Sequence, residues 1–258
     1  MHMPACSVFK DVERGLAQDE FFFVLQPKVN LQNNRLCGFE CLIRWQHPRG
    51  DVLEPMHFVS VMEDSHLAGR FTDRLLVRAS QTLAQWRAAG HNTLGLSINL
   101  SAVELGQKDL PGKIEAMLTS LRVCPANFEI ELTDVVHPGQ LDWLVDAIQA
   151  VRSTGARVAL DGCGAGFNSF TLLQQLPVDI VKFDRSLMEH VLVNDESRRM
   201  IESLVRLAQN HGKRVVLTGL ETVEQYRWAQ TLPDIDGQGF FIGEPSLEAN
   251  VETFSLRV

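Results

Sequence analysis

The chain has 258 residues, of which 45% are hydrophobic and 22% charged, so it can bury a substantial core and has the composition of an ordinary globular protein. It contains no run of about 18 uncharged apolar residues, which excludes a membrane-spanning helix, and the charged segment 1–15 lacks the apolar core of a signal peptide. The formal net charge of −8 opposes nonspecific binding to a nucleic-acid polymer, so we expect a cytoplasmic protein that binds neither such polymers nor membranes.

The cysteines indicate a reducing environment. There are five of them, an odd number, and no two have the CxxC spacing of a zinc or redox site. We therefore expect reduced and mostly buried thiols at Cys6, Cys37, Cys41, Cys124 and Cys163.

The chain begins with two strand-like segments. Residues 20–30 and 36–45 are rich in aromatic and β-branched side chains and flank an Asn-rich turn, which predicts a hairpin. Pro55 is expected to start a helix that runs through His66. A longer amphipathic helix is predicted for residues 71–89, closed by Gly90.

Beyond residue 90, strands and helices alternate. Strands are predicted at 94–100, 128–132, 157–161, 179–184 and 214–220. Helical patterns lie between them at 110–121, 138–155, 169–176 and 196–212, and segments 222–232 and 237–243 complete the alternation. About eight strands separated by helices predict a TIM-like (β/α)₈ barrel of the α/β class with an N-terminal hairpin. We divide the chain into a helical lead-in, 1–19, and a single barrel domain, 20–258.

Residues 157–170 (RVALDGCGAGFNSF) are the most informative stretch for a binding site. The strand ends at Asp161, and Gly162, Gly164 and Gly166 follow, which can take positive φ and let a loop approach a ligand closely. A nucleotide-cofactor (Rossmann) fingerprint is a weaker interpretation. It would use Asp184 as the acidic residue, but the third glycine lacks the required spacing and the following helix is short.

Polar residues recur at the ends of the other predicted strands. They are Glu40, Asn99, Glu131, Asp161, Lys182, Thr218, Glu221 and Gln238. In a barrel of this type the carboxyl ends of the strands carry the functional residues. Oxygen donors without His or Cys suit Mg²⁺, Mn²⁺ or Ca²⁺, and Lys182 and Arg44 beside them would suit a phosphate ester.

Seven motifs in the chain resemble those of one known family. They are ECLIRWQHP at 40–48, SINLSA around Asn99, EIELTD around Glu131, LDGCGAGFNS from Leu160, VDIVKFDRSLM around Lys182, GLET at 219–222 and DGQGFFIGEP around Gln238. In this order they are similar to the motifs of EAL domains, from about Phe21 to Pro245. The resemblance implies a TIM-barrel phosphodiesterase that hydrolyses the bacterial second messenger cyclic di-GMP to pGpG with two divalent cations.

The resemblance also implies roles for individual residues. The ligands of a first Mg²⁺ or Mn²⁺ ion would be Glu40, Asn99, Glu131 and Asp161. The residues that contact the dinucleotide or lie near it would be Gln26, Arg44 and Gln238. Lys182 would orient the attacking water or the phosphate, and Glu221 is the one carboxylate kept from its motif.

Two positions depart from the family pattern. Gly162 and Thr218 stand where the family has carboxylates that hold the second metal ion. The adjacent loop also differs at Cys163, Phe167 and Asn168, and Asp134 replaces the glutamate that braces this loop.

These departures predict a degenerate EAL domain. It would hold at most one ion, bind cyclic di-GMP as a receptor or regulator, and hydrolyse it slowly or not at all. A weakly active phosphodiesterase and a protein-interaction module that no longer binds the nucleotide, acting on an unidentified regulatory protein, are the alternatives. A homodimer is compatible with the sequence.

Overall fold

The computed structural model describes residues 5–59, 67–133, 141–164 and 169–247, together with residues 251 and 254. Within these residues eight strands form one closed barrel, and a short ninth strand, β3 (Val52–Leu53), pairs with one end of the second. In chain order the barrel strands are β1 (Phe21–Asn30), β2 (Leu36–Gln46), β4 (Gly95–Leu100), β5 (Phe128–Leu132), β6 (Arg157–Cys163), β7 (Ile180–Phe183), β8 (Arg214–Leu217) and β9 (Ile235–Gly237). The predicted TIM-like (β/α)₈ barrel is confirmed.

Strand β1 differs from the others in direction. It pairs antiparallel with β2 on one side and with β9 on the other, while the remaining barrel pairs are parallel. The predicted hairpin is therefore confirmed, and it closes the barrel. Its register places Gln26 directly opposite Glu40, so two expected site residues are neighbours. The last strand lies earlier than the sequence suggested, because the glycine-rich segment after Gly237 turns away from the sheet.

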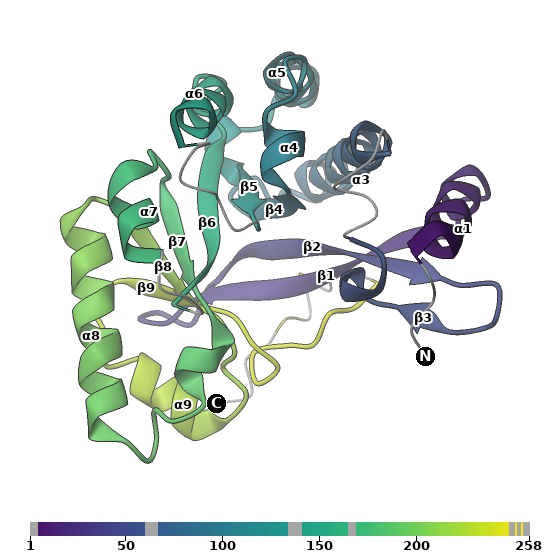
Figure 1. Ribbon diagram of the computed structural model, residues 1–258. Helices are drawn as coiled ribbons and strands as arrows, with labels where there is room; N and C mark the ends of the chain where they lie inside the picture. Colours follow the sequence, from purple (N-terminus) through teal and green to yellow (C-terminus); the bar gives the residue numbers. More distant parts are fainter. Residues whose placement is uncertain are drawn as a thin grey trace.

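Helices surround the outside of the barrel (Figure 1). They are α1 (Ala5–Ala17), α3 (Ala68–Ala88), α4 (Ala102–Leu105), α5 (Leu110–Leu121), α6 (Leu141–Arg152), α7 (Ser169–Gln175), α8 (Asp195–Asn210) and α9 (Val223–Ala229). Helix α3 begins three residues before the predicted start and is followed by Gly90 with a φ of 86°. Across the described ranges, no helix is both long enough and apolar enough to cross a bilayer.

Two predictions fall partly on residues that are not described. The helix expected from Pro55 to His66 starts as a 3₁₀ turn, η1 (Pro55–His57), and residues 60–66 lie outside the described ranges. The helix expected at 138–155 is described from Leu141 onward as α6. Asp134, Gly166, Phe167 and Asn168, from the loops that depart from the family pattern, also lie outside.

The barrel interior is divided between an apolar part and a charged part. Ala159, Ile180 and Val216 form a small apolar cluster on three neighbouring strands. Lys182 lies two residues beyond Ile180, on the same inward face of β7, and Lys28 is buried on β1. A charged group in a barrel interior is costly unless it is paired, so these lysines require partners inside the barrel.

The lead-in helix packs directly on the barrel. Val12 and Leu16 of α1 join a buried apolar cluster with Phe21, Trp45 and Phe71. The indole of Trp45 is 1% exposed, and its Nε1 donates a hydrogen bond to Glu20 over 2.9 Å. Trp45 thus packs between α1 and the hairpin.

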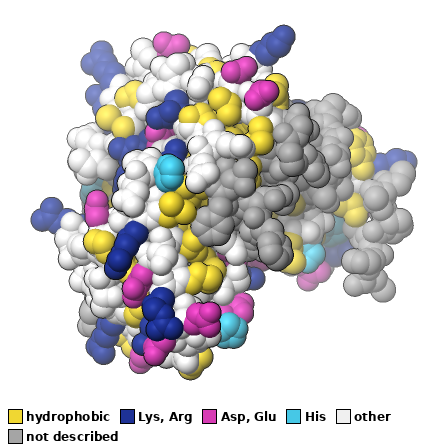
Figure 2. All heavy atoms as spheres, turned by 60° about the vertical axis from the view of Figure 1, so that its left-hand side comes forward, with side chains coloured by type: hydrophobic (Ala, Val, Ile, Leu, Met, Phe, Trp, Pro, Cys, Tyr) yellow, Lys and Arg dark blue, Asp and Glu magenta, His cyan; other side chains and the backbone are white. Residues whose placement is uncertain are grey.

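The surface has mixed charge where it can be seen. Figure 2 shows basic, acidic and apolar side chains interspersed over the described part of the face that carries α8. The described side chains of one sign of charge are thus not gathered on this face.

Four cysteine side chains are described, and all four are free thiols, as predicted. Cys41 and Cys163 are buried, Cys37 is half-buried and Cys124 is exposed. The expectation that most of the thiols are buried therefore holds for Cys41 and Cys163 but not for Cys37 and Cys124.

Thiol labelling is expected to follow this division. Burial raises the pKa of Cys41 and of Cys163 to about 12, with Asp161 adding to the effect at Cys163, so at pH 8 both are protonated and shielded. In a short pulse of iodoacetamide, Cys124 should be labelled while Cys41 and Cys163 remain unmodified. Peptide mass spectrometry measures this, with labelling in denaturant as the control. Rapid native labelling of Cys163 would contradict the prediction.

Candidate functional site

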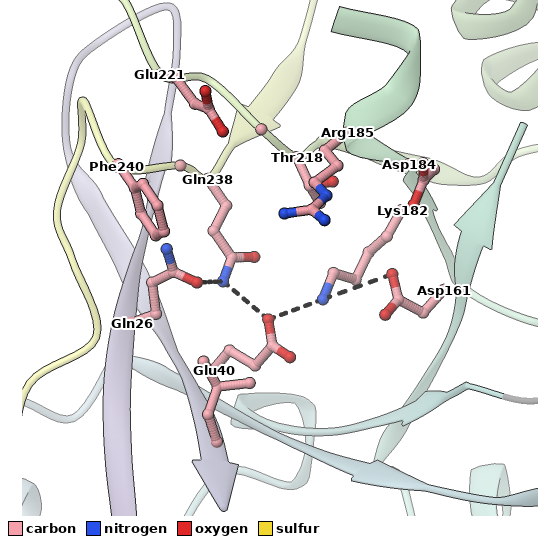
Figure 3. Close-up of a pocket in the computed structure, with 13 residues that line it drawn as sticks. Gln26, Glu40, Asp161, Lys182, Asp184, Arg185, Thr218, Glu221, Gln238 and Phe240 are labelled. Carbon is pink, nitrogen blue, oxygen red and sulfur yellow. Dashed lines mark hydrogen bonds and ion pairs between the residues drawn. The ribbon is translucent and has the colours of Figure 1, made fainter. Parts of the chain in front are cut away.

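The strand ends converge on a cavity of about 250 Å³ at one end of the barrel (Figure 3). Its walls come from β1, β2, β6 and β7 and from the segments that follow β7, β8 and β9. The lining residues are Gln26, Glu40, Leu42, Asp161, Lys182, Asp184, Arg185, Thr218, Gly219, Glu221, Gln238, Gly239 and Phe240. Residues more than 200 positions apart in the chain thus form one polar cavity.

Lys182 is the centre of the cavity floor. Its side chain is 2% exposed, and its Nζ lies 2.9 Å from Glu40 Oε2 and 3.7 Å from Asp161 Oδ1, and also donates to Glu131 Oε2. Burial alone would lower the pKa of Lys182, but the three carboxylates outweigh it and hold the pKa well above its usual value. The ammonium therefore stays charged and occupies the space among the carboxylates.

Asp161 lies where β6 reaches the cavity. Its Oδ1 accepts a hydrogen bond from the Gly162 amide over 2.8 Å. Burial, opposed by Lys182 and reinforced by Glu131 and Glu40, raises the pKa of Asp161 to about 6. The glycines that follow behave as predicted where they are described, since Gly162 and Gly164 have φ values of 69° and 103°.

Glu131 lies below Lys182 and is completely buried. Its Oε1 is 3.2 Å from Lys28 Nζ, while its Oε2 accepts from Lys182. Lys28 Nζ also donates to Ser97 Oγ and to Glu129 Oε1, both over 3.0 Å. Burial would lower the pKa of Lys28, but Glu129 and Glu131 outweigh it and hold the pKa above its ordinary value. We call these linked charges the ion column: Glu129, Lys28, Glu131, Lys182, Glu40 and Asp161.

Two glutamine amides complete the cavity floor. Gln238 is 3% exposed, and its Nε2 donates to Glu40 Oε2 over 2.8 Å and to Gln26 Oε1 over 3.0 Å. Gln26 in turn donates to the Gly243 carbonyl over 3.3 Å. Gln238 Oε1 is buried and has no hydrogen-bond partner among the described residues, so it can accept a hydrogen bond from a ligand or bind a cation.

Asn99 and Arg44 lie to the side of this cavity. Asn99 Nδ2 donates to Glu40 Oε1 over 2.7 Å, and Asn99 lines a second cavity of about 500 Å³, on which Glu40 also borders. Arg44 is farther from the centre, because its guanidinium donates to the Ile43 carbonyl over 2.9 Å and lies 3.5 Å from Glu54. Arg44 is thus outside the described lining of both cavities.

Of the two departures from the family pattern, Thr218 lines the main cavity, whereas Gly162 does not line it but follows Asp161, which does. A Cβ built at Gly162 would have no neighbour within 4 Å among the described residues. Thr218 lines the cavity, and its Oγ1 donates to the Phe183 carbonyl over 2.8 Å. Glu221 also lines the cavity but is exposed at its rim. The wall near Thr218 therefore carries a hydroxyl where a carboxylate would reach inward.

The sequence interpretation missed several residues of the site. Arg185 begins the 3₁₀ turn η4 (Arg185–Met188), and its guanidinium faces the cavity in Figure 3. Gly219 makes room for it, since a Cβ there would lie 2.4 Å from Arg185 Cβ. Phe240 is 58% exposed on the opposite side of the cavity. Only the position of Arg185 directly after a strand end could have indicated it beforehand.

Lys28 was also missed, although the strand pattern could have shown it. Side chains on a strand alternate, so Lys28 shares the inward face of β1 with Gln26 and Asn30. A lysine on that face of a barrel strand predicts a buried partner of opposite charge, which the structure supplies as Glu129 and Glu131.

The expected metal ligands have suitable chemistry for a hard divalent cation. Glu40, Glu131 and Asp161 offer carboxylate oxygens and Asn99 an amide oxygen, the donors that Mg²⁺ and Mn²⁺ prefer. Among the described residues, however, no group of three or more His, Cys, Asp or Glu is arranged to hold a metal ion. In this structure the three carboxylates contact the ammonium of Lys182 instead.

Comparison with models of known protein families identifies the family of this chain. The family model described as the EAL domain matches residues 10–245. The chain belongs to the EAL domain family. Family phosphodiesterases use divalent metal ions, in keeping with the oxygen donors around Lys182.

Two curated proteins similar to this chain have names that refer to signalling or to cyclic di-GMP. The chain is 32% identical to the cyclic di-GMP phosphodiesterase RocR of Pseudomonas aeruginosa over 238 residues, which are 92% of this chain and 60% of RocR. It is 29% identical to an uncharacterized signaling protein of Caulobacter vibrioides over 237 residues, 92% of this chain and 29% of that protein. The chain thus spans less than two thirds of either relative.

A solved EAL structure has the same fold. The FimX EAL domain from Pseudomonas aeruginosa bound to c-di-GMP superposes with a TM-score of 0.84 at 19% identity, covering 96% of this chain and 99% of that one. At this identity the comparison supports the barrel fold and leaves the chemistry to the residues of the site.

Proposed function

We propose that this EAL domain binds cyclic di-GMP as a receptor or regulator and hydrolyses it slowly or not at all. The observation that carries the proposal is the pair Gly162 and Thr218, which face or adjoin the cavity without a carboxylate. The names of the relatives support the ligand, since RocR is named a cyclic di-GMP phosphodiesterase and FimX was solved with c-di-GMP.

Binding is attributed to cations and amides around the cavity. Arg185 and Lys182 supply positive charge for a phosphodiester, and Gln26 and Gln238 supply hydrogen-bonding groups at the floor. Phe240 presents an exposed ring at the rim, on which a base could stack. These groups do not depend on a second metal ion, so ligand binding can persist where hydrolysis is lost.

Weak hydrolysis follows from the missing carboxylates. A divalent ion held by Glu40, Asn99, Glu131 and Asp161 would polarise a phosphate oxygen and favour ionisation of a bound water. Without carboxylates at positions 162 and 218, the described lining keeps Asp184 and the exposed Glu221 near a neighbouring ion that would share the water. We infer that these two do not replace the pair that the family pattern has there. Lys182 would then neutralise charge on the phosphodiester.

Calorimetric titration with cyclic di-GMP tests the binding part. We expect binding at about micromolar or lower concentration in a Mg²⁺ buffer, and Arg185→Gln should weaken it about tenfold because one charged hydrogen bond to phosphate is lost. Arg199→Gln on the exposed face of α8 removes the same charge away from the cavity and should leave the affinity unchanged.

The same titration separates the alternative functions. If the wild-type chain shows no binding, the receptor proposal fails and a protein-interaction module is favoured. Hydrolysis is then measured by incubating the protein with cyclic di-GMP and Mg²⁺ or Mn²⁺ and quantifying pGpG by chromatography. Turnover at the rate of an active phosphodiesterase would contradict the degenerate assignment.

A further inference from the structure

Lys28 is a buried cation for which the proposed function has no role. Its side chain is 8% exposed, and it reaches the barrel interior from β1, below the cavity that Gln26 lines on the same strand. Three hydrogen bonds hold its ammonium, to Ser97, Glu129 and Glu131. It lines no part of the ligand cavity.

Glu131 connects Lys28 to the cavity. One of its carboxylate oxygens binds Lys28 and the other binds Lys182, so each ammonium takes one side of the same group. Lys182 can therefore remain within reach of Glu40 and Asp161 at the cavity floor. Without Lys28, the full charge of Glu131 would act on Lys182 alone.

The charge count of the ion column shows why this matters. Two ammonium groups and four carboxylates leave a formal charge of −2 when all are ionised, and removal of Lys28 would make it −3. Because four members of the column are buried, namely Lys28, Glu40, Glu131 and Lys182, water screens this change poorly and the electrostatic potential of the cavity above becomes more negative. A phosphodiester anion and a divalent cation would respond to that change in opposite directions.

We propose that Lys28 is a positioning residue that acts through Glu131 to set the charge of the cavity, so that the cavity accepts a phosphodiester anion and competes less strongly for a free divalent cation. The inference rests on the proposed function, in which that anion is cyclic di-GMP.

Two titrations of the Lys28→Met variant test this inference. With cyclic di-GMP in the presence of a chelator, we expect binding about tenfold weaker than in the wild type. With Mn²⁺ and no nucleotide, we expect binding about tenfold tighter. Lys28→Arg keeps the charge and should restore both affinities toward the wild-type values.

Controls separate the charge of the column from packing and from net charge. Lys213→Met removes a lysine whose Nζ binds only the carbonyls of Leu176 and Val178 among the described residues, and it should change neither affinity. Lys28→Met with Glu129→Gln restores the formal charge of the column and should recover nucleotide binding. This double variant also serves if the single variant does not fold.

Several outcomes would overturn the inference. If Lys28→Met weakens the binding of both cyclic di-GMP and Mn²⁺, the role of Lys28 is only structural. If it changes neither affinity, the charge of the ion column does not influence the cavity. Side-chain ¹⁵N NMR gives a test without any ligand, since removal of Lys28 should shift the protected ammonium signal of Lys182. An unshifted signal would contradict the coupling. Should the wild type not bind cyclic di-GMP, the proposed function fails, and the Mn²⁺ and NMR measurements still judge Lys28.

Discussion

Gly162→Asp combined with Thr218→Glu is expected to raise the rate of cyclic di-GMP hydrolysis about a thousandfold. The two carboxylates would supply ligands for a second divalent ion, and a pair of ions can activate a bridging water and stabilise the leaving oxygen. A thousandfold corresponds to about 4 kcal/mol of transition-state stabilisation, which is comparable to the several kcal/mol that a bound metal ion can supply. Chromatographic quantification of pGpG in Mg²⁺ or Mn²⁺ buffer measures the change.

The local structure permits both substitutions. A Cβ at position 162 meets no described atom within 4 Å, although the φ of 69° makes a side chain there strained, and Asp tolerates that region better than most residues. The Thr218→Glu substitution removes one hydrogen bond, which the Thr218 hydroxyl donates to the Phe183 carbonyl. In Mg²⁺ or Mn²⁺ buffer, binding of the nucleotide should be retained, since a divalent ion held by the new carboxylates offsets their charge.

The matched control is Gly162→Asn with Thr218→Gln, which reproduces the shapes without the charges. It should remain as slow as the wild type. Equal activation by the amide pair would show that loop geometry, rather than metal ligation, limits the rate. A wild-type chain already as fast as the carboxylate variant would remove the basis of the degenerate assignment.

Glu131→Gln is expected to have the largest effect on stability. Glu131 is completely buried between two ammonium groups, so the neutral amide leaves both with less compensation in a medium that solvates charge poorly. Loss of one partner in a buried ion pair costs about 3–5 kcal/mol, and we expect the free energy of unfolding to fall by about 3 kcal/mol. Urea denaturation followed by tryptophan fluorescence measures it.

Glu129→Gln is the matched control for this prediction. It lies two residues away on the same strand, keeps 13% of its side chain exposed and contacts only Lys28 among the described charges. It should cost about 1 kcal/mol, because Lys28 retains Glu131 and Ser97. Equal effects of the two substitutions would show that the ion column contributes no more than ordinary hydrogen bonds.

The sequence correctly indicated the main features of the fold because they depend on local periodicity. Alternating strands and helices gave the barrel, and the aromatic run with its Asn-rich turn gave the hairpin. The predicted ends of helices and strands were less accurate where capping and packing compete with the hydrophobic pattern. Helix α3 starts at Ala68, three residues before the predicted start, and β9 ends at Gly237, where the predicted segment begins. The segment from Pro55 was expected as an α-helix but begins as a 3₁₀ turn.

The sequence by itself determined which chemical groups this EAL domain carries, because motif order and strand alternation place Glu40, Asp161 and Lys182 at the same barrel end. Only the tertiary structure decided how these groups are paired. It showed that the carboxylates enclose the Lys182 ammonium and that Arg44 points to Glu54 instead of the cavity. It also showed that Lys28 contacts one carboxylate oxygen of Glu131 while Lys182 contacts the other. The reason is physical: a strand pattern fixes the face on which a side chain lies, but the partner of a buried charge comes from strands distant in the chain, and their contact is settled only when the barrel closes.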